Sequence, residues 1–356
     1  MGFILRPRLS LLDIDIDKDW RGHRIDNLGS PATPKQVCRW VDRVAPTDYL
    51  KDRFAKILHS VDFAEKTLDL PEWIWTAHPV YDGTYLYAGG EFGMFKIDPI
   101  QMKIVSTLDF PKEFYELVGL CTDGVYLYGV FYSGHLAKFD PENLAILKSS
   151  LPYDWTGYNL GFDGTYLYAT YSPELGVGAL LKVDPITLKE VTHITFGGEV
   201  FEICFSGDYL YVGSVSPELP ARIYKIDPVN MSVVSSLDLV PSPPPSMVSS
   251  LCYDGHYLYA GTDTGVFKVD PAAMSVAQSR EITNGVDYIS SDGTYLYLAS
   301  YYSILKIDPI TFNVISEWSV GQRTVQVLSD GIYLYAVCYP PGVGRIIRRP
   351  VMRIRY

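Results

Sequence analysis

Aromatic and acidic residues in the segments between apolar runs are the best candidates for binding chemistry in this sequence. Aromatic faces stack on the C–H faces of sugars, and carboxylates accept hydrogen bonds from sugar hydroxyls. We therefore predict a carbohydrate-binding surface, although any single ring could instead pack between structural units. The candidate ligand-binding residues are Trp73, Trp75, Tyr115, Tyr132, Tyr153, Asp154, Trp155, Tyr158, Tyr171, Glu199, Tyr301 and Tyr302.

Signatures of catalysis or metal binding are missing from the sequence. The histidines fall at unrelated positions, and neither a G-x-S-x-G nor an H-E-x-x-H pattern occurs. The acidic run from Asp13 to Asp19 has Lys18 where a calcium loop needs glycine, and Arg24 where it needs glutamate. We predict no catalytic residue, no metal and no cofactor. A pair of rim carboxylates that cleaves a glycosidic bond remains an alternative.

Composition narrows the class of protein. With 356 residues, 47% hydrophobic and 20% charged, the chain suits a large globular domain, and no apolar run is long enough to span a membrane. The net charge of −11 disfavours nucleic acid as a partner. Residues 1–8 lack the features of a secretory signal, and the five cysteines show no C-x-x-C spacing. We therefore predict neither export by that route nor a disulfide framework.

A repeat organises most of the chain. Tyr-Leu-Tyr occurs seven times at intervals of 38 to 48 residues, usually after Asp-Gly, and six copies continue to Lys-x-Asp-Pro. In the seventh copy we align the degenerate run Ile347-Arg348-Arg349-Pro350 with that motif. The Tyr-Leu-Tyr copies begin at Tyr85, Tyr126, Tyr166, Tyr209, Tyr257, Tyr295 and Tyr333.

Each repeat reads as four short β-strands separated by turn residues. Asp-Gly suits a tight hairpin, and the proline of Asp-Pro cannot donate to a strand ladder. Four antiparallel strands in each of seven units predict an all-β fold, a seven-bladed β-propeller. Cys121, Cys204 and Cys252 share one position of the repeat that other copies fill with small or apolar residues, so we predict that these thiols pack in the innermost strands.

The predicted connectivity places the Asp-Gly and Asp-Pro turns on one rim of the propeller and the other connections on the opposite rim. We call these the uniform rim and the varied rim, because only the second differs in length and content from blade to blade. Scaffolding turns are expected to be uniform, whereas binding residues are often found on variable loops. All the candidate ligand-binding residues belong to the predicted varied rim.

The repeat resembles the YVTN and quinoprotein-like propeller repeats through its Asp-Gly-x-Tyr-Leu-Tyr and Lys-x-Asp-Pro-x-Thr elements, the last threonine being Thr187 or Thr311. The resemblance covers residues 72–350. It implies the propeller fold but no particular activity, because propellers of this kind include both enzymes and binding modules.

Residues 1–63 lie outside the repeat and predict an extended strand followed by two amphipathic helices. Leu12-Asp13, the run from Arg24 to Pro31, Val37 and Val41-Asp42 resemble a segment of phage tail fibres, although Pro34-Lys35 replaces the usual Asp-Ala. The resemblance implies an assembly segment that joins a fibre stalk or forms a trimeric collar. An ordinary helical cap on the propeller is the alternative.

These observations predict two parts, an assembly segment at 1–63 and a propeller at 64–356, with residues 64–70 pairing with blade seven to close the ring. The predicted function is a non-enzymatic viral attachment or structural protein that binds a cell-surface glycan or protein. A polysaccharide lyase or hydrolase and a subunit of an extracellular filament are the alternatives. We expect a homo-oligomer, with a trimer favoured, and virion or assembly proteins as partners, without membrane insertion. The expected location is the virion or another extracellular assembly, with the cytoplasm as the alternative.

Overall fold

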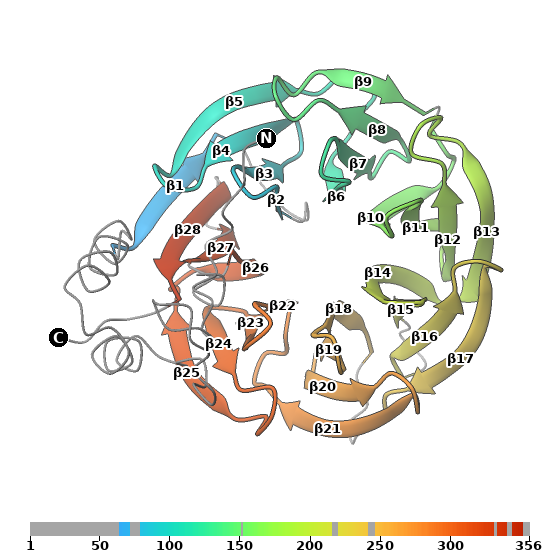
Figure 1. The fold of residues 1–356 in the computed structure, drawn as a ribbon, viewed down its shortest axis with the longest axis vertical. Helices are drawn as coiled ribbons and strands as arrows, with labels where there is room; N and C mark the ends of the chain where they lie inside the picture. The colour runs from blue at the N-terminus through green and yellow to red at the C-terminus, as the bar shows by residue number, and fades with distance from the viewer. Residues whose placement is uncertain are drawn as a thin grey trace, which may run out of the picture.

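The computed structural model describes residues 64–71, 79–150, 152–215, 220–240, 246–330, 333–339 and 344–351, and these contain strands but no helix. The strands form seven four-stranded sheets around a central axis (Figure 1). The predicted seven-bladed β-propeller is confirmed. The fibre-like segment at 1–63 lies outside the described residues.

Each blade is one sheet, numbered here from the N-terminal end. Blades one to four are β2 (Val80–Tyr81), β3 (Leu86–Gly89), β4 (Gly93–Asp98) and β5 (Lys103–Asp109); β6 (Leu117–Thr122), β7 (Leu127–Phe131), β8 (Leu136–Phe139) and β9 (Ile146–Ser149); β10 (Thr156–Phe162), β11 (Leu167–Glu174), β12 (Val177–Val183) and β13 (Glu190–Gly197); and β14 (Glu199–Ser206), β15 (Tyr209–Val215), β16 (Arg222–Asp227) and β17 (Ser232–Asp238). Blades five to seven are β18 (Val248–Tyr253), β19 (Leu258–Thr262), β20 (Gly265–Asp270) and β21 (Ser275–Glu281); β22 (Tyr288–Ser291), β23 (Leu296–Ser300), β24 (Ser303–Ile307) and β25 (Val314–Ser319); and β26 (Arg323–Ser329), β27 (Tyr333–Tyr339), β28 (Gly344–Pro350) and β1 (Lys66–Leu70).

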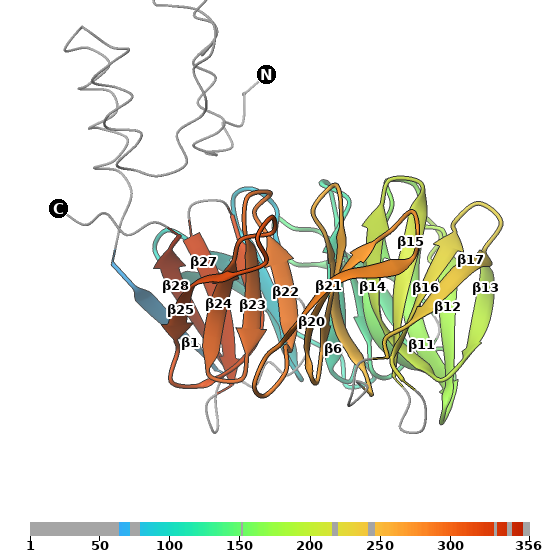
Figure 2. The same ribbon diagram turned by 90° about the horizontal axis from the view of Figure 1, so that it is seen from below.

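Six blades follow chain order from the strand nearest the axis to the strand at the circumference (Figures 1 and 2). Neighbouring strands are antiparallel, as in the pairing of β2 with β3 and of β4 with β5. The Asp-Gly turn between the first two strands and the Asp-Pro turn between the last two therefore lie at the same end of the blade. This arrangement gives the uniform and varied rims defined above.

Blade seven takes its outermost strand from the N-terminal side of the propeller. β1 pairs antiparallel with β28, from Lys66 opposite Arg348 to Leu70 opposite Gly344. Asp69 and Arg345 form an ion pair across the same two strands. The ammonium of Lys66 donates to the carbonyl of Ile100 at 3.4 Å, which places the start of β1 at the uniform rim.

The Asp-Gly turn is held by its own aspartate. In blade three, Oδ1 of Asp163 accepts the backbone N–H groups of Thr165 and Tyr166, both at 2.7 Å, and Oδ2 accepts the hydroxyl of Tyr168 at 2.9 Å. The tyrosine bond recurs in blades one, two, five, six and seven. The aspartate and the last tyrosine of Asp-Gly-x-Tyr-Leu-Tyr thus form one local unit that fixes the hairpin.

Replacing Asp163 by alanine should lower the free energy of unfolding by about 2 kcal/mol, because three hydrogen bonds are lost and a partly buried tyrosine hydroxyl loses its acceptor. Chemical denaturation of the variant measures the effect. The matched control is Asp154→Ala, which removes an exposed aspartate on the varied rim and should change stability by less than about 0.5 kcal/mol. Equal losses in the two variants would contradict this role for the turn aspartate.

The lysine of Lys-x-Asp-Pro joins neighbouring blades. Nζ of Lys96 lies 4.2 Å from the ring centroid of Tyr85 and donates to the carbonyl of Pro141 in blade two at 2.8 Å. Lys182, Lys225 and Lys268 make the same bond to the proline carbonyl of the following blade. In these four blades the motif lysine therefore tethers the Asp-Pro turn of the next blade.

The register of the seventh copy corrects the sequence alignment by one residue. Arg348 lies opposite Tyr335, as Lys96 lies opposite Tyr87, so Arg348 and not Ile347 occupies the lysine position. Its guanidinium donates to the carbonyls of Pro99 and Ile100 at 2.9 and 2.7 Å. Pro350 therefore does not occupy the proline position of the motif, which falls at Val351, and blade seven has no Asp-Pro turn.

The hydrophobic core lies between the blades rather than at the centre of the ring. Each buried cluster joins two neighbouring blades, such as Tyr297 and Ile304 of blade six with Leu334 and Ile347 of blade seven. Cys121, Cys204 and Cys252 are free thiols on the innermost strands of their blades, as predicted. Burial raises the pKa of the Cys252 thiol to about 12, so this thiol is a packing group rather than a reactive thiolate.

Candidate functional site

Three predicted ligand residues form a continuous row on the varied rim. Tyr115 lies in the connection between β5 and β6, Tyr132 in the turn between β7 and β8, and Tyr158 on β10. Ring centroids are 6.2 Å apart between Tyr115 and Tyr132 and 6.5 Å apart between Tyr132 and Tyr158, both in edge-to-face geometry. We call these three residues the tyrosine arc. It extends from the loop after blade one to blade three.

The backbone holds the first two members of the arc together. The N–H of Tyr132 donates to the carbonyl of Glu116 at 2.8 Å, and the N–H of Tyr115 donates to the hydroxyl of Ser133 at 3.3 Å. Tyr115 and Tyr132 are nevertheless 47% and 45% exposed. Their rings are therefore positioned by the fold without being buried in it, which is the arrangement a binding surface needs.

Carboxylates lie beside the arc. Glu91 and Glu116 raise the pKa of the Tyr115 hydroxyl. Burial, with Glu199 as the next largest cause, raises the pKa of Tyr158 to about 12. Ring faces and hydrogen-bond acceptors thus occur together on one part of the varied rim.

Phe201 extends the row and was not among the predicted residues. It lies on β14, and its ring centroid is 4.3 Å from that of Tyr158. Tyr158 and Phe201 both occupy β-bulges of innermost strands, where the ladder register shifts. A bulge turns a side chain out of the strand alternation. The sequence carries no local signal for it, because the extra residue is only visible once the strands are paired.

Three other predicted residues form a separate, largely internal cluster in blade three. Tyr171 is fully buried and packs against Tyr153, at a centroid distance of 5.3 Å. The ring centroid of Trp155 lies 5.5 Å from that of His193, which is on the outermost strand β13. Tyr171 therefore serves packing and does not reach the rim surface. Asp154, which lies between Tyr153 and Trp155 in the sequence, is exposed.

Tyr301 and Tyr302 are exposed in the turn between β23 and β24 of blade six, with centroids 4.4 Å apart. The guanidinium of Arg323 lies 5.5 Å from the Tyr301 ring. Burial raises the pKa of the nearby Asp287 carboxyl, which accepts the N–H of Tyr301, and Arg323 opposes that shift. This is a second polar and aromatic group on the rim, without described contacts to the arc. Trp73 and Trp75 lie outside the described residues.

Glu202 has the most strongly raised pKa of the described carboxyl groups, and it was not among the residues predicted from the sequence. It lies on β14, is 7% exposed, and burial raises its pKa to about 8 despite a hydrogen bond from the backbone N–H of Leu251. Cys204 and Tyr288 are its titratable neighbours, and Cys252 interacts with both of them. The only signal in the sequence is a charged residue inside an innermost strand, at a position where the neighbouring blades have Asn159 and Ser250.

Within the described ranges, no group of three histidine, cysteine, aspartate or glutamate side chains is arranged to hold a metal ion. The same part of the chain has no helix with the length and apolar character needed to cross a membrane. The chemistry offered by the arc is contact with ring faces and hydrogen bonding to carboxylates.

A comparison with protein-family models found no match for this chain, and a search of curated proteins found no relative. The geometry of the rim is therefore the basis of the functional proposal.

Proposed function

We propose that this chain is a non-enzymatic attachment protein whose varied rim binds a carbohydrate through the tyrosine arc. The observation that carries the proposal is the row of Tyr115, Tyr132 and Tyr158, two of them nearly half exposed, beside Glu91 and Glu199. Neighbouring aromatic rings that stay exposed on a folded protein often mark an interaction site.

The chemistry of the arc fits a sugar chain better than a flat protein surface. The tyrosine rings offer apolar faces to sugar C–H groups, and their hydroxyls can both donate and accept hydrogen bonds. The carboxylates accept from sugar hydroxyls. The arc continues from one blade to the next, so it matches an extended oligosaccharide of several units.

Placement on a virus-like particle rests on the fibre-like sequence of residues 1–63. The start of β1 at the uniform rim supports it, because a chain held through the residues before Lys66 would present the arc on the opposite face. A mass measurement in solution tests the trimeric form. A strict monomer of the full-length chain would exclude it, and imaging of the native assembly separates a virion component from a filament or a free protein.

Glycan binding is tested by applying the purified protein to an array of bacterial and animal oligosaccharides. Tyr132→Ala should weaken binding to the recognised glycan by about tenfold, because one stacking face of the arc is removed. The matched control is Tyr302→Ala, which removes a similarly exposed tyrosine of the same rim outside the arc and should leave affinity unchanged. No binding to any glycan, or equal effects of the two changes, would reject the arc as the site.

The enzyme alternative is tested on the same glycans by following the release of reducing or unsaturated ends. Accumulation of product with time, abolished by Asp154→Asn or Glu199→Gln, would establish a hydrolase or lyase and overturn the non-enzymatic proposal. Binding without turnover is the expected result.

A further inference from the structure

Six of the seven blade interfaces are filled by a plug residue that follows the Asp-Pro turn of the second blade. Each plug residue has a positive φ, from 47° at Met274 to 63° at Leu144, which turns its side chain back into the interface. Leu144, for example, is fully buried and packs with Tyr87 and Met94 of the preceding blade. The six plug residues are Met102, Leu144, Leu188, Met231, Met274 and Phe312.

The plug has a fixed place in the repeat. It comes six residues after the motif lysine, as Met102 follows Lys96 and Phe312 follows Lys306. The residues on both sides of the plug, and the one two before it, are exposed in every blade that has it. The turn therefore has two exposed residues, an apolar plug and another exposed residue; the plug is buried in five blades and half-buried at Met274.

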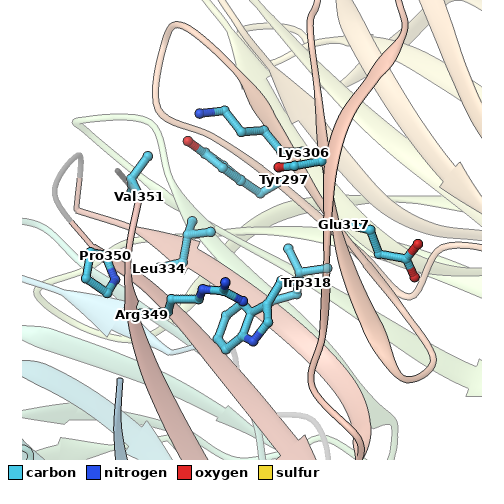
Figure 3. A pocket seen from close by; sticks show the side chains of 10 residues that line it. Tyr297, Lys306, Glu317, Trp318, Leu334, Arg349, Pro350 and Val351 are labelled. Atoms are coloured by element: carbon cyan, nitrogen blue, oxygen red, sulfur yellow. The ribbon is translucent and has the colours of Figure 1, made fainter. Parts of the chain in front are cut away.

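The interface between blades six and seven has no such plug in the described chain, and a cavity of about 300 Å³ occurs there (Figure 3). Tyr297, Ile304 and Trp318 line it from blade six, and Leu334 and Arg349 line it from blade seven. In the preceding interface the plug Phe312 stacks on Tyr259 at a centroid distance of 6.3 Å, and Tyr297 is the residue equivalent to Tyr259. The cavity thus corresponds to the empty place of a seventh plug. We call it the blade-seven socket.

Ring closure explains why the socket is open. The outermost strand of blade seven is β1, which comes from the other end of the propeller, so no turn joins β28 to its outer neighbour. Blade seven therefore lacks the turn that carries the plug in the other six blades.

We propose that Ile354 occupies the blade-seven socket and completes the seventh interface. Arg348 holds the lysine position, and Ile354 follows it by six residues, the spacing of all six plugs. The neighbouring residues Arg353 and Arg355 fall at the two positions that are exposed in every other blade. Arg353-Ile354-Arg355 therefore has an apolar residue between two polar ones, at the positions where the other six blades have a plug between two exposed residues.

The socket has an apolar part that an aliphatic side chain can contact. The rings of Tyr297 and Trp318 and the side chains of Ile304 and Leu334 form this part, whereas Lys306, Ser316, Glu317 and Arg349 make the rest of the lining polar. The guanidinium of Arg349 lies 4.9 Å from the Trp318 ring (Figure 3). An apolar residue there gains contact with these surfaces and removes them from water, whereas a charged residue would have to be desolvated.

Two substitutions in the full-length chain separate the socket from a general effect of the tail. Ile354→Asp should lower the midpoint of thermal unfolding by roughly 5 °C and increase quenching of Trp318 by acrylamide. The matched control is Met352→Asp, because the residue at that position is exposed in all six other blades; it should leave both readouts unchanged. Ile354→Leu should behave as the unmodified protein. Subtracting the signal of the Trp318→Phe background assigns the quenching to Trp318.

Equal effects of Ile354→Asp and Met352→Asp, or no effect of Ile354→Asp, would overturn the proposal. A destabilisation by Ile354→Asp that depends on protein concentration would assign the socket to the tail of a second copy, and would overturn the intramolecular assignment. The readouts do not involve glycan binding, so the result is independent of the proposed function.

Discussion

Glu202→Gln should stabilise the propeller by about 3 kcal/mol at pH 7. Burial raises the pKa of this carboxyl from an ordinary value of 4.5 to about 8. The folded protein at neutral pH must therefore keep a proton on Glu202 that the unfolded chain releases. Glutamine has the same shape and can still accept the N–H of Leu251, but it carries no charge to desolvate.

The same shift fixes the pH dependence of stability. A group with a raised pKa in the folded state contributes its full stability below 4.5, and that contribution is lost as the pH rises to about 8. The nearby Cys204, Cys252 and Tyr288 all have pKa values raised by burial, so they stay neutral across this window. Glu202→Gln should remove the decline that Glu202 causes.

Denaturant unfolding of both proteins at pH 5, 7 and 9 measures the effect. The difference between them should be small at pH 5 and largest at pH 9. Glu281→Gln is the control, because Glu281 is exposed on β21 and its replacement should leave the wild-type pH profile intact. A Glu202→Gln variant less stable than wild type at pH 9 would show that the carboxylate is paired in a way that offsets its burial.

Arg348→Ala should weaken ring closure and lower the free energy of unfolding by about 3 kcal/mol. The side chain is fully buried, donates to two carbonyls of blade one, and lies 4.3 Å from the Tyr333 ring. Alanine leaves both carbonyls without that donor and opens space beneath the turn. Among the described strands β1 pairs with β28 alone, so its amide protons should also exchange faster with solvent.

Hydrogen exchange of residues 66–70, together with chemical denaturation, checks this prediction. Arg348→Lys is the matched control, because lysine occupies the equivalent position in six blades and bonds the proline carbonyl in four of them. It should retain more than half of the lost stability. Equal losses for alanine and lysine would show that the cation has no specific part in closure.

The two rims have different physical roles. On the uniform rim six of the seven blades repeat the hydrogen bond that Tyr168 donates to Asp163, so the residues that recur are those that build the scaffold. On the varied rim the loops differ from blade to blade, and Tyr132 in one of these loops is 45% exposed. A chain anchored at the uniform rim and binding at the varied rim would keep anchoring and recognition apart.

The sequence by itself determined the number of blades, the positions of their turns and the strand that closes the ring. These features depend on local chemistry that is repeated. Asp163 accepts hydrogen bonds from groups within five residues of it. The residues Lys66-Thr67-Leu68-Asp69-Leu70-Pro71 have nearly the same sequence as Ser106-Thr107-Leu108-Asp109-Phe110-Pro111 at the end of an outermost strand, and they too supply an outermost strand. Seven copies of one local pattern make such predictions insensitive to an error in any one of them.

Only the tertiary structure decided which aromatic rings are exposed, how strongly Glu202 is desolvated and which residue of the seventh copy takes the lysine position. Tyr171 and Tyr132 look alike in the sequence, yet one is fully buried and the other is 45% exposed. Exposure, pKa and register all depend on what a neighbouring blade places against a residue, and that neighbour lies about 40 residues or more away in the chain. Spacing along the chain carries no information about such contacts.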